Sequence, residues 1–247
     1  MSMSPRAFTV FLVSTAVVSS AWLAANLHGQ EEKPFHISQA HVGSMTMSGP
    51  PQGIDGKSVS LFDGNFWTDW RQRDGQPSQW MVRPDHSVRV HGGDAVSNGE
   101  YGDLQLHLEF KCPKIDGATG QARGNSGVYI QGRYEIQVLD SFGLPPSDSS
   151  CGGIYGQHTP LVNAAYPAEV WQTYDIVFRA PRFDEKGEVV EKPRMTVLLN
   201  GQVIHNNVEL SGPTPGGLDS TMSPTGPILL QDHGDAVEYR NIWVRPL

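Results

Sequence analysis

Glu135 and Gln137 are polar side chains that stand two residues apart in the segment 134–140 (YEIQVLD). If Ile136 and Val138 point into a hydrophobic core, the alternation of a β-strand sends Glu135 and Gln137 to the opposite face. Side chains at positions i and i+2 of a strand lie about 7 Å apart, which suits two contacts to one sugar ring. The pair is therefore a candidate saccharide site, and two solvated outward residues are the alternative.

Asn125 and a glycine-rich loop flank the segment that holds Glu135. Asn125 directly precedes the strand expected to pair with the Glu135 strand, so a hairpin would place the two side chains in one region. The loop 151–158 (CGGIYGQH) adds an aromatic ring at Tyr155 and an imidazole at His158. Alone, such a loop is a turn-rich connection, but beside Glu135 it offers further contacts to a sugar.

A third group of polar side chains follows the apolar run 228–230, where Gln231, Asp232 and His233 precede Gly234. A histidine next to an aspartate can have its tautomer and its charge set by that neighbour. Together with Glu135, these residues offer the acid and base groups that sugar chemistry requires.

The elements that must position these residues are predicted to be β-strands. In residues 103–110 every second residue is apolar, which is typical of a half-buried strand. Gly132-Arg133 is predicted to be a two-residue hairpin connection, and Asn200-Gly201 between two apolar runs is a strong hairpin signal. After residue 28 no window shows helical periodicity, so we expect an all-β, antiparallel sandwich. The expected strands are 103–110, 127–131, 134–139, 172–179, 195–199, 202–205, 228–231 and 237–244.

Composition supports this fold class and excludes one class of partner. Gly 27 and Pro 18 in 247 residues exceed the average share of turn-forming residues, which favours β-structure over helical bundles. The formal net charge is −8, and the 18 Lys and Arg residues form no basic run. Nucleic-acid backbones require clustered cations, so no nucleic-acid partner is expected.

The N-terminal segment is not expected to belong to the sandwich. Residues 7–27 are uncharged and largely apolar and follow Arg6, which is the pattern of a secretory signal peptide. The run is also long enough to span a bilayer, so a retained membrane anchor is the alternative. In both cases the body is exported to the periplasm or the outside of the cell. The predicted divisions are a signal or anchor at 1–28, a linker at 29–56 and a β-sandwich at 57–247.

Two cysteines, Cys112 and Cys151, lie in the predicted exported body. An oxidising compartment permits a disulfide between them, and two separate buried thiols are the alternative. Neither residue has the spacing of a zinc site.

Several short motifs spread through residues 57–247 occur in the order of one known family. They are SLFDG at 60–64, NSGV at 125–128, YEIQVLD at 134–140, GIYG at 153–156, WQTY at 171–174, GPILLQDHG at 226–234 and YRNI at 239–242. The set resembles the 3-keto-disaccharide hydrolase family, whose fold is the concanavalin A-like lectin/glucanase sandwich, a jelly roll. Two features depart from it: Trp171-Gln172 replaces a frequent Trp-Asn, and residues 182–192 look like a charged insertion.

The resemblance implies a saccharide substrate, a glycoside whose sugar carries a ketone at C3. The ketone acidifies the proton at C2, so a base can remove it and the glycosidic oxygen can leave from C1 by β-elimination, after which water adds. This route needs a base, a group that stabilises the enolate, and an acid for the leaving group. It does not need the paired carboxylates of ordinary glycosidases.

The candidate catalytic residues for this route are Glu135 or His233 as the base, with Asp232 orienting His233. A divalent cation bound by these three side chains could polarise the ketone, although the sequence names no metal and no protein partner. Trp171 suits a sugar ring and equally a hydrophobic core. The residues expected to contact the saccharide are Asn125, Gln137, Tyr155, His158, Trp171, Gln231 and Arg240.

Two other functions remain open from the sequence. The sandwich fold also hosts carbohydrate-binding modules without activity, in which the same face would grip an unoxidised glycan. A conventional retaining glucanase would use Glu135 together with Asp140. Residues at i and i+5 of a regular strand face opposite sides unless a bulge intervenes, which argues against this pair.

Overall fold

The computed structural model describes residues 57–247, which belong to the compact unit His41–Leu247. The predicted signal or anchor and the predicted linker lie outside the described residues. Within residues 57–247 the only helix is the short 3₁₀ turn η2 (Gly120–Ala122), which agrees with the expected all-β class. No helix in the described part of the chain is long and apolar enough to cross a membrane.

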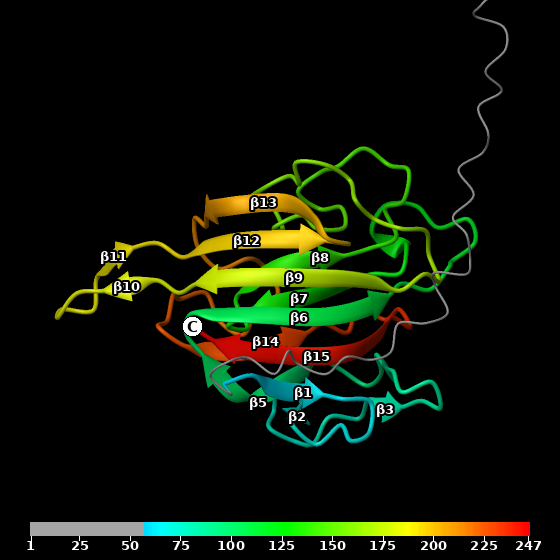
Figure 1. Cartoon of the computed structure of the whole chain (residues 1–247), viewed down its shortest axis with the longest axis horizontal. Helices are drawn as coiled ribbons and strands as arrows, with labels where there is room; N and C mark the ends of the chain where they lie inside the picture. Colours follow the sequence, from blue (N-terminus) through cyan, green and yellow to red (C-terminus); the bar gives the residue numbers. More distant parts are fainter. Residues whose placement is uncertain (1–56) are drawn as a thin grey trace, which may run out of the picture. The chain divides into compact units, whose positions relative to one another are not determined.

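The largest of three antiparallel sheets in the described residues has eight strands and lies in front in Figure 1. β1 pairs with β15 beside the main path of this sheet. The path runs in the order β13 (Gln202–Glu209), β12 (Arg194–Leu199), β9 (Gln172–Arg179), β6 (Leu104–Lys111), β15 (Glu238–Pro246), β4 (Val88–Arg89) and β3 (Met81–Val82), with β1 spanning Val59–Phe62.

The second sheet has five strands and forms the rear layer in Figure 1. Its edge strand β8 is extended sideways by the loop 152–155, which forms an isolated bridge between Ile154 and Ile136. The glycine-rich loop therefore lies directly against the strand that carries Glu135. The order of this sheet is β2 (Trp70–Arg71), β5 (Ala95–Tyr101), β14 (Gly226–Leu230), β7 (Ser126–Ile130) and β8 (Tyr134–Val138).

The hydrophobic core lies between the two sheets. The apolar residues of β6 are fully buried, which confirms the alternation predicted for residues 103–110. Ile136 and Val138 of β8 are buried in the same core, so the residues that alternate with them, Glu135 and Gln137, face away from it. Each such side chain contributes about 1.5–3 kcal/mol on burial, and the core thereby fixes which face of β8 carries Glu135.

Two predicted hairpins are present, and one of them differs in length from the prediction. Asn200 and Gly201 have φ of 54° and 77°, as expected for a two-residue turn. The β7–β8 connection contains three residues, because Gln131 leaves the strand with φ of 55°. The Gln131 side chain is buried and donates to the carbonyls of Tyr101 and Pro224, which holds it in this turn.

The Asn200 side chain offers a stability test of the fold. It donates to Ala164 O at 2.8 Å and accepts from Thr173 N at 3.0 Å, while its backbone has positive φ. We expect Asn200→Ala to lower the free energy of unfolding by about 2–4 kcal/mol in a urea titration. Asn98→Ala, at an exposed position with one long hydrogen bond, should change it by less than about 0.5 kcal/mol. Equal effects of the two changes would contradict this interpretation.

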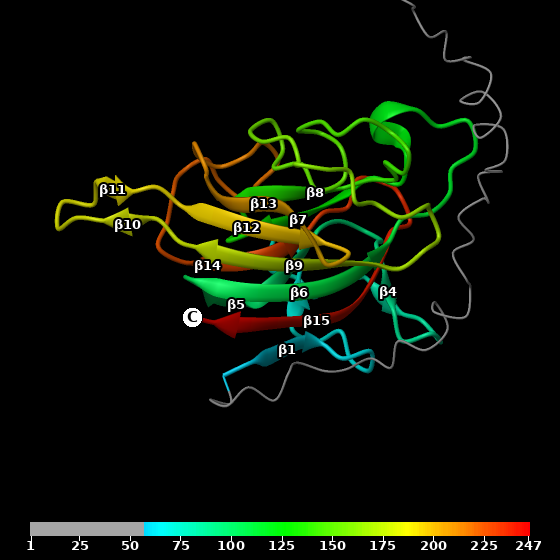
Figure 2. The ribbon, with the colours of Figure 1, turned by 45° about the horizontal axis from the view of Figure 1, so that its top comes forward.

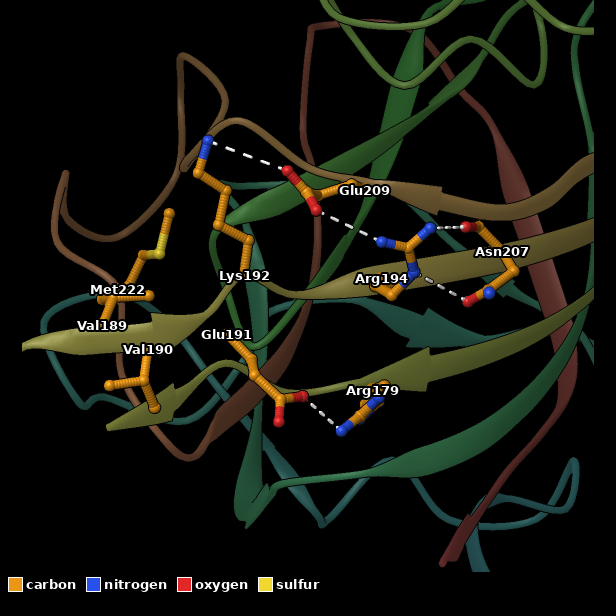
Figure 3. A pocket seen from close by; sticks show the side chains of 9 residues that line it. All are labelled: Arg179, Val189, Val190, Glu191, Lys192, Arg194, Asn207, Glu209 and Met222. Carbon is orange, nitrogen blue, oxygen red and sulfur yellow. Dashed lines mark hydrogen bonds and ion pairs between the residues drawn. The ribbon is translucent and has the colours of Figure 1, made fainter. Parts of the chain in front are cut away.

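The predicted charged insertion forms the hairpin of β10 (Arg182–Phe183) and β11 (Val189–Glu191), which extends beyond the ends of β9 and β12 in Figures 1 and 2. It contributes to a groove of about 640 Å³ with β12, β13 and Met222 (Figure 3). Arg194 and Lys192 both pair with Glu209 there, at 3.2 and 3.8 Å. Arg179 pairs with Glu191 beside them, so the charged residues that line this exposed groove are three cations and two carboxylates.

Candidate functional site

The outward face of the five-stranded sheet carries a line of four residues, three of them polar, that lie on or directly beside four neighbouring strands. Gly127 pairs with Gln137, and Gln231 N donates to Gly127 O at 2.9 Å. Because Leu230 pairs with Ala95, Asp94 comes next to Gln231. We call Gln137, Gly127, Gln231 and Asp94 the polar row.

Glu135 lies in the adjacent line of outward residues, between two tyrosines. Tyr129 is its register partner on β7, and Tyr155 N donates to Glu135 O from the other side at 3.2 Å. The predicted neighbours Glu135, Gln137 and Tyr155 are therefore brought together. The same alternation that points Glu135 outward also points Tyr129 outward, a residue that the sequence interpretation missed.

The carboxyl group of Glu135 occupies the space that Gly127 leaves empty. A methyl group on Gly127 would lie 2.5 Å from Glu135 Oε1, so only glycine permits this position of the carboxyl. The Glu135 side chain is 3% exposed, and burial raises its pKa to about 7 although a hydrogen bond with the Tyr129 hydroxyl opposes the rise. A carboxyl that titrates near neutrality is suited to accept and return protons.

Two amide oxygens of the polar row have no hydrogen-bond partner among residues 57–247. Gln137 Nε2 donates to Gln121 Oε1 at 2.8 Å and to Asn125 Oδ1 at 3.0 Å, which turns Gln137 Oε1 away from these acceptors. Gln231 Nε2 donates to the Tyr129 oxygen at 3.1 Å. Both Oε1 atoms are buried and unpartnered within this part of the chain. Such acceptors suit the hydroxyl groups of a bound ligand.

The side-chain groups of Asn125 are used in hydrogen bonds within the protein, so Asn125 supports the polar row and does not offer these groups to a ligand. Its side chain is 2% exposed, and it donates to Gln121 O at 3.0 Å while accepting from Gln137. Its backbone nitrogen donates to Asp235 Oδ2 at 2.7 Å. Asn125 is thus brought to the site as predicted, but it acts by holding Gln137. Gln121, which follows no local motif, was missed.

Asp232 connects two loops at the end of the polar row. Its carboxylate accepts from Gly93 N at 2.8 Å and from Gly234 N at 2.9 Å, and its own nitrogen donates to Asp94 at 2.7 Å. No hydrogen bond of the described residues joins Asp232 to His233, which is exposed at the rim. The predicted catalytic roles of these two residues stay predictions, and the contacts of Asp232 indicate a structural one as well.

Removal of one acceptor from Asp232 tests this structural role. We expect Asp232→Asn to lower the free energy of unfolding by about 1–2 kcal/mol, because an amide has one oxygen for two backbone donors. The measurement is a urea titration at pH 7. Asp74→Asn is the control, since Asp74 is exposed and accepts only one local backbone bond. An unchanged stability of Asp232→Asn would show that the loop contacts carry little energy.

Three predicted binding residues lie away from Glu135. His158 Nε2 is 2.8 Å from Glu209 O, at the end of β13 in the other sheet. Arg240 projects from β15 on the outer face of the eight-stranded sheet, and its guanidinium carbon lies 4.1 Å from the centre of the Trp171 ring. Arg240 also pairs with Glu109 at 2.7 Å. Trp171 and Arg240 therefore form a contact of their own on the opposite side of the sandwich.

A segment that the sequence interpretation missed covers part of the site. Residues 214–218, which we call the strap, begin at Thr214, whose Oγ1 accepts from Glu135 N at 3.0 Å. Arg73 donates to the strap carbonyls of Gly216 and Gly217, and Leu218 packs against the small outward cluster that includes Tyr129. The strap comes from a stretch without strand or helix periodicity, so no local signal placed it here.

No group of three or more His, Cys, Asp or Glu side chains in residues 57–247 is arranged to hold a metal ion. Glu135, Asp232 and His233 are therefore not brought together as the predicted three-ligand set. Cys112 and Cys151 are both buried free thiols, the second of the two alternatives given by the sequence. Burial raises the pKa of both thiols.

Two cavities in the described residues lie elsewhere. One is the groove beside β11, and the other has about 310 Å³ and surrounds the buried Glu238. Glu238 is paired with Arg89 and Lys111, each at 2.7 Å, and with Arg83 at 3.3 Å. The buried carboxylate of the second cavity is held by three cations, and the charges of the first cavity lie at an exposed surface, so the chemistry of the side chains favours Glu135 and the polar row as the site.

The chain is similar to proteins of known structure. The family described as a 3-keto-alpha-glucoside-1,2-lyase-like domain matches residues 57–245. A candidate glycosyl hydrolase from Parabacteroides distasonis is 36% identical, and the match covers 77% of this chain and 84% of that chain with a TM-score of 0.71. Two more candidate glycosyl hydrolases of that organism show the fold alone, at 19% and 23% identity with TM-scores of 0.59 and 0.53. These two matches cover 78% and 77% of this chain and 95% and 100% of the others. No curated protein matches the chain.

These similarities agree with the layered architecture and with the ordered motifs of the sequence. The fold is a concanavalin A-like jelly roll, and the domain is of a carbohydrate-active kind. Over residues 57–245, the chain belongs to the 3-keto-alpha-glucoside-1,2-lyase-like domain family.

Proposed function

We propose that the protein cleaves glycosides whose sugar has been oxidised to a ketone at C3, with Glu135 as the base. The observation that carries this proposal is the Glu135 carboxyl itself, which is buried above Gly127 and has a pKa of about 7. Family membership supplies the substrate class. Export of the body, predicted from residues 7–27, is part of the same proposal.

The proposed reaction begins with transfer of the C2 proton to the Glu135 carboxylate. The electrons of the C2–H bond move into the C3 carbonyl as an enolate. They then return to form the C1–C2 double bond while the C1–O bond to the leaving group breaks. The protonated Glu135 then gives its proton to the departing oxygen, and water added at C1 completes the proposed cleavage. His233 at the rim is the second candidate for proton transfer.

In this proposal the two unpartnered amide oxygens bind the sugar by accepting hydrogen bonds from its hydroxyl groups. Gln137 Oε1 and Gln231 Oε1 lie on either side of Gly127 in the polar row and lack donors among residues 57–247. Sugar hydroxyls would supply these donors, which removes the cost of two buried unsatisfied acceptors, about 1–3 kcal/mol each. Tyr155, the neighbour of Glu135 across the loop, would limit the sugar on the other side.

The experiment that tests the proposal is incubation of the protein with a panel of 3-keto-glycosides, including 3-keto-trehalose and a 3-keto-β-glucoside. We expect release of the leaving group, and mass spectrometry with NMR of the products should distinguish the C1–C2 unsaturated ketone from the hydrated sugar. A parallel series with a chelator reports on a metal requirement. Turnover of ordinary glycosides with no turnover of keto-glycosides would overturn the proposal.

The pH dependence of the rate provides an independent prediction. Because the base must be ionised, kcat/KM should rise with pH and level off above about 7, the pKa of Glu135 in the folded chain. Initial rates between pH 5 and 9 check this in the free enzyme. A rate that is already maximal at pH 5 would remove Glu135 as the base.

A conventional retaining glucanase would need Asp140 as its second catalytic carboxylate, and Asp140 is already engaged elsewhere. Asp140 lies beyond the end of β8, and its Oδ2 pairs with Arg123 at 2.8 Å. Retaining enzymes use two carboxyl groups about 5–5.5 Å apart on either side of the bond. With Asp140 engaged by Arg123, Glu135 is better suited to the single-base route.

A further inference from the structure

Tyr129 is the register partner of Glu135 on the neighbouring strand and has no role in the chemistry described so far. Its hydroxyl donates to Pro215 O of the strap at 3.0 Å and accepts from Gln231 Nε2 at 3.1 Å. The Glu135 carboxyl lies beside the same ring: the point where Gly127 would carry a methyl group is 2.5 Å from Glu135 Oε1 and 3.0 Å from Tyr129 Cε2, the ring carbon next to the one that bears the hydroxyl. A hydrogen bond from this hydroxyl to the Glu135 carboxyl also opposes the rise in the pKa of Glu135. A phenol has one hydrogen, so Pro215 O and Glu135 compete for it.

We propose that the Tyr129 hydroxyl is a two-position hydrogen-bond switch that donates to ionised Glu135 and turns to Pro215 O when Glu135 is protonated. The role in turnover rests on the proposed function, in which Glu135 takes the C2 proton. After that transfer the new O–H of Glu135 donates to the Tyr129 oxygen, which has a second lone pair beside the one used by Gln231. Tyr129 keeps its own proton throughout, so it is a positioning residue.

The burial of the site explains why such a switch is needed. Tyr129 is fully buried and Glu135 is 3% exposed, so bulk water is not free to follow the change of charge. A buried carboxyl left without a hydrogen-bond partner in either protonation state would lower the stability of the folded protein by about 1–3 kcal/mol or more. Rotation of one hydroxyl satisfies Glu135 in both protonation states without movement of heavy atoms.

Two surroundings keep Tyr129 in this role. Burial and the neighbouring charge of Glu135 raise the pKa of Tyr129, so the phenol remains protonated wherever Glu135 titrates. The strap supplies the second acceptor, and Thr214 in the same strap binds the backbone of Glu135. The strap thereby fixes both ends of the proposed switch.

The test is a carboxyl-carbon NMR titration of Glu135 in the full chain, without any sugar. In Tyr129→Phe the ionised carboxylate loses its donor, so we expect Glu135 to bind its proton roughly tenfold more tightly than in the wild type. The acid limb of the rate profile should move to higher pH by the same amount. Tyr134→Phe is the matched control, because Tyr134 precedes Glu135 on β8 but points into the core, and its hydroxyl has no partner within residues 57–247.

An unchanged titration of Glu135 in Tyr129→Phe, or an equal change in Tyr134→Phe, overturns the switch. If Tyr129→Phe does not fold, Gln231→Met removes the amide that holds the phenol and should move the titration in the same direction by a smaller factor. No change in that variant also overturns the inference. The titration is independent of turnover, so a wild type that cleaves no 3-keto-glycoside contradicts the proposed function and leaves the titration result standing.

Discussion

Glu135→Gln is expected to reduce kcat on a 3-keto-glycoside by about 10²–10⁴-fold, which is the usual contribution of a positioned base. Glutamine has nearly the same shape and fits the space above Gly127, but it cannot accept the C2 proton. Binding should therefore persist while turnover is lost. Calorimetry of the variant with an uncleaved 3-keto-glycoside measures the first quantity, and initial rates measure the second.

The same substitution has a predictable effect on stability. The pKa of Glu135 is about 7 in the folded chain against an ordinary value of 4.5, so the folded state holds a proton that the unfolded state has lost between these values. The stability contributed by this group is complete below pH 4.5 and is lost as the pH rises through 7. Glu135→Gln cannot ionise and should gain up to about 3 kcal/mol over the wild type at pH 8, but nothing at pH 4.

The control for both effects is Glu100→Gln, at an exposed position of β5 in the same sheet. It should leave kcat unchanged and should alter the stability difference between pH 4 and pH 8 by less than about 0.5 kcal/mol. If Glu135→Gln binds more weakly but turns over bound substrate at the wild-type rate, Glu135 is a binding residue and the base lies elsewhere, with His233 as the next candidate.

The parts of the site that the sequence predicted are those determined by strand alternation within one hairpin. Ile136 and Val138 are apolar and face the core, so Glu135 and Gln137 had to face outward, and the short connection to β7 kept Asn125 near them. Tyr129 obeys the same alternation between Val128 and Ile130 and could have been found by it. The turn at Asn200 followed from the backbone preference of Asn-Gly.

The residues that the sequence misplaced depend on which sheet a strand joins. Trp171 and Arg240 belong to β9 and β15 or their ends, and both strands pair in the eight-stranded sheet, on the other side of the core from Glu135. Alternation determines whether a side chain faces inward or outward, but it does not distinguish one outer face from the other. That distinction depends on long-range pairing. The position of the strap also depends on a long-range contact, because Arg73, more than 140 residues away in the sequence, holds it in place.

Gly127→Ala is expected to abolish most of the turnover while the fold remains intact. The new methyl group would lie 2.5 Å from Glu135 Oε1 and 3.0 Å from a ring carbon of Tyr129, so the carboxyl must move out of its position. A displacement of about 1 Å at a reacting group costs on the order of 10²-fold in rate. Gly127 has no left-handed backbone, and alanine in a strand interior is slightly favoured over glycine, so the unfolding midpoint should change little.

A second substitution separates displacement of the carboxyl from other effects of the methyl group. Aspartate is one methylene shorter than glutamate, so Glu135→Asp in the Gly127→Ala background should place a carboxyl above the methyl and recover part of the lost rate. In the wild-type background Glu135→Asp should instead lower the rate, because the shorter side chain falls short of the same position. Gly212→Ala, where the new methyl group would meet nothing closer than Met222 Cε at 3.9 Å, is the control and should keep the full rate. Wild-type turnover in Gly127→Ala would mean that the position of the Glu135 carboxyl above this glycine has no part in the reaction, and the base would then have to be sought at the rim.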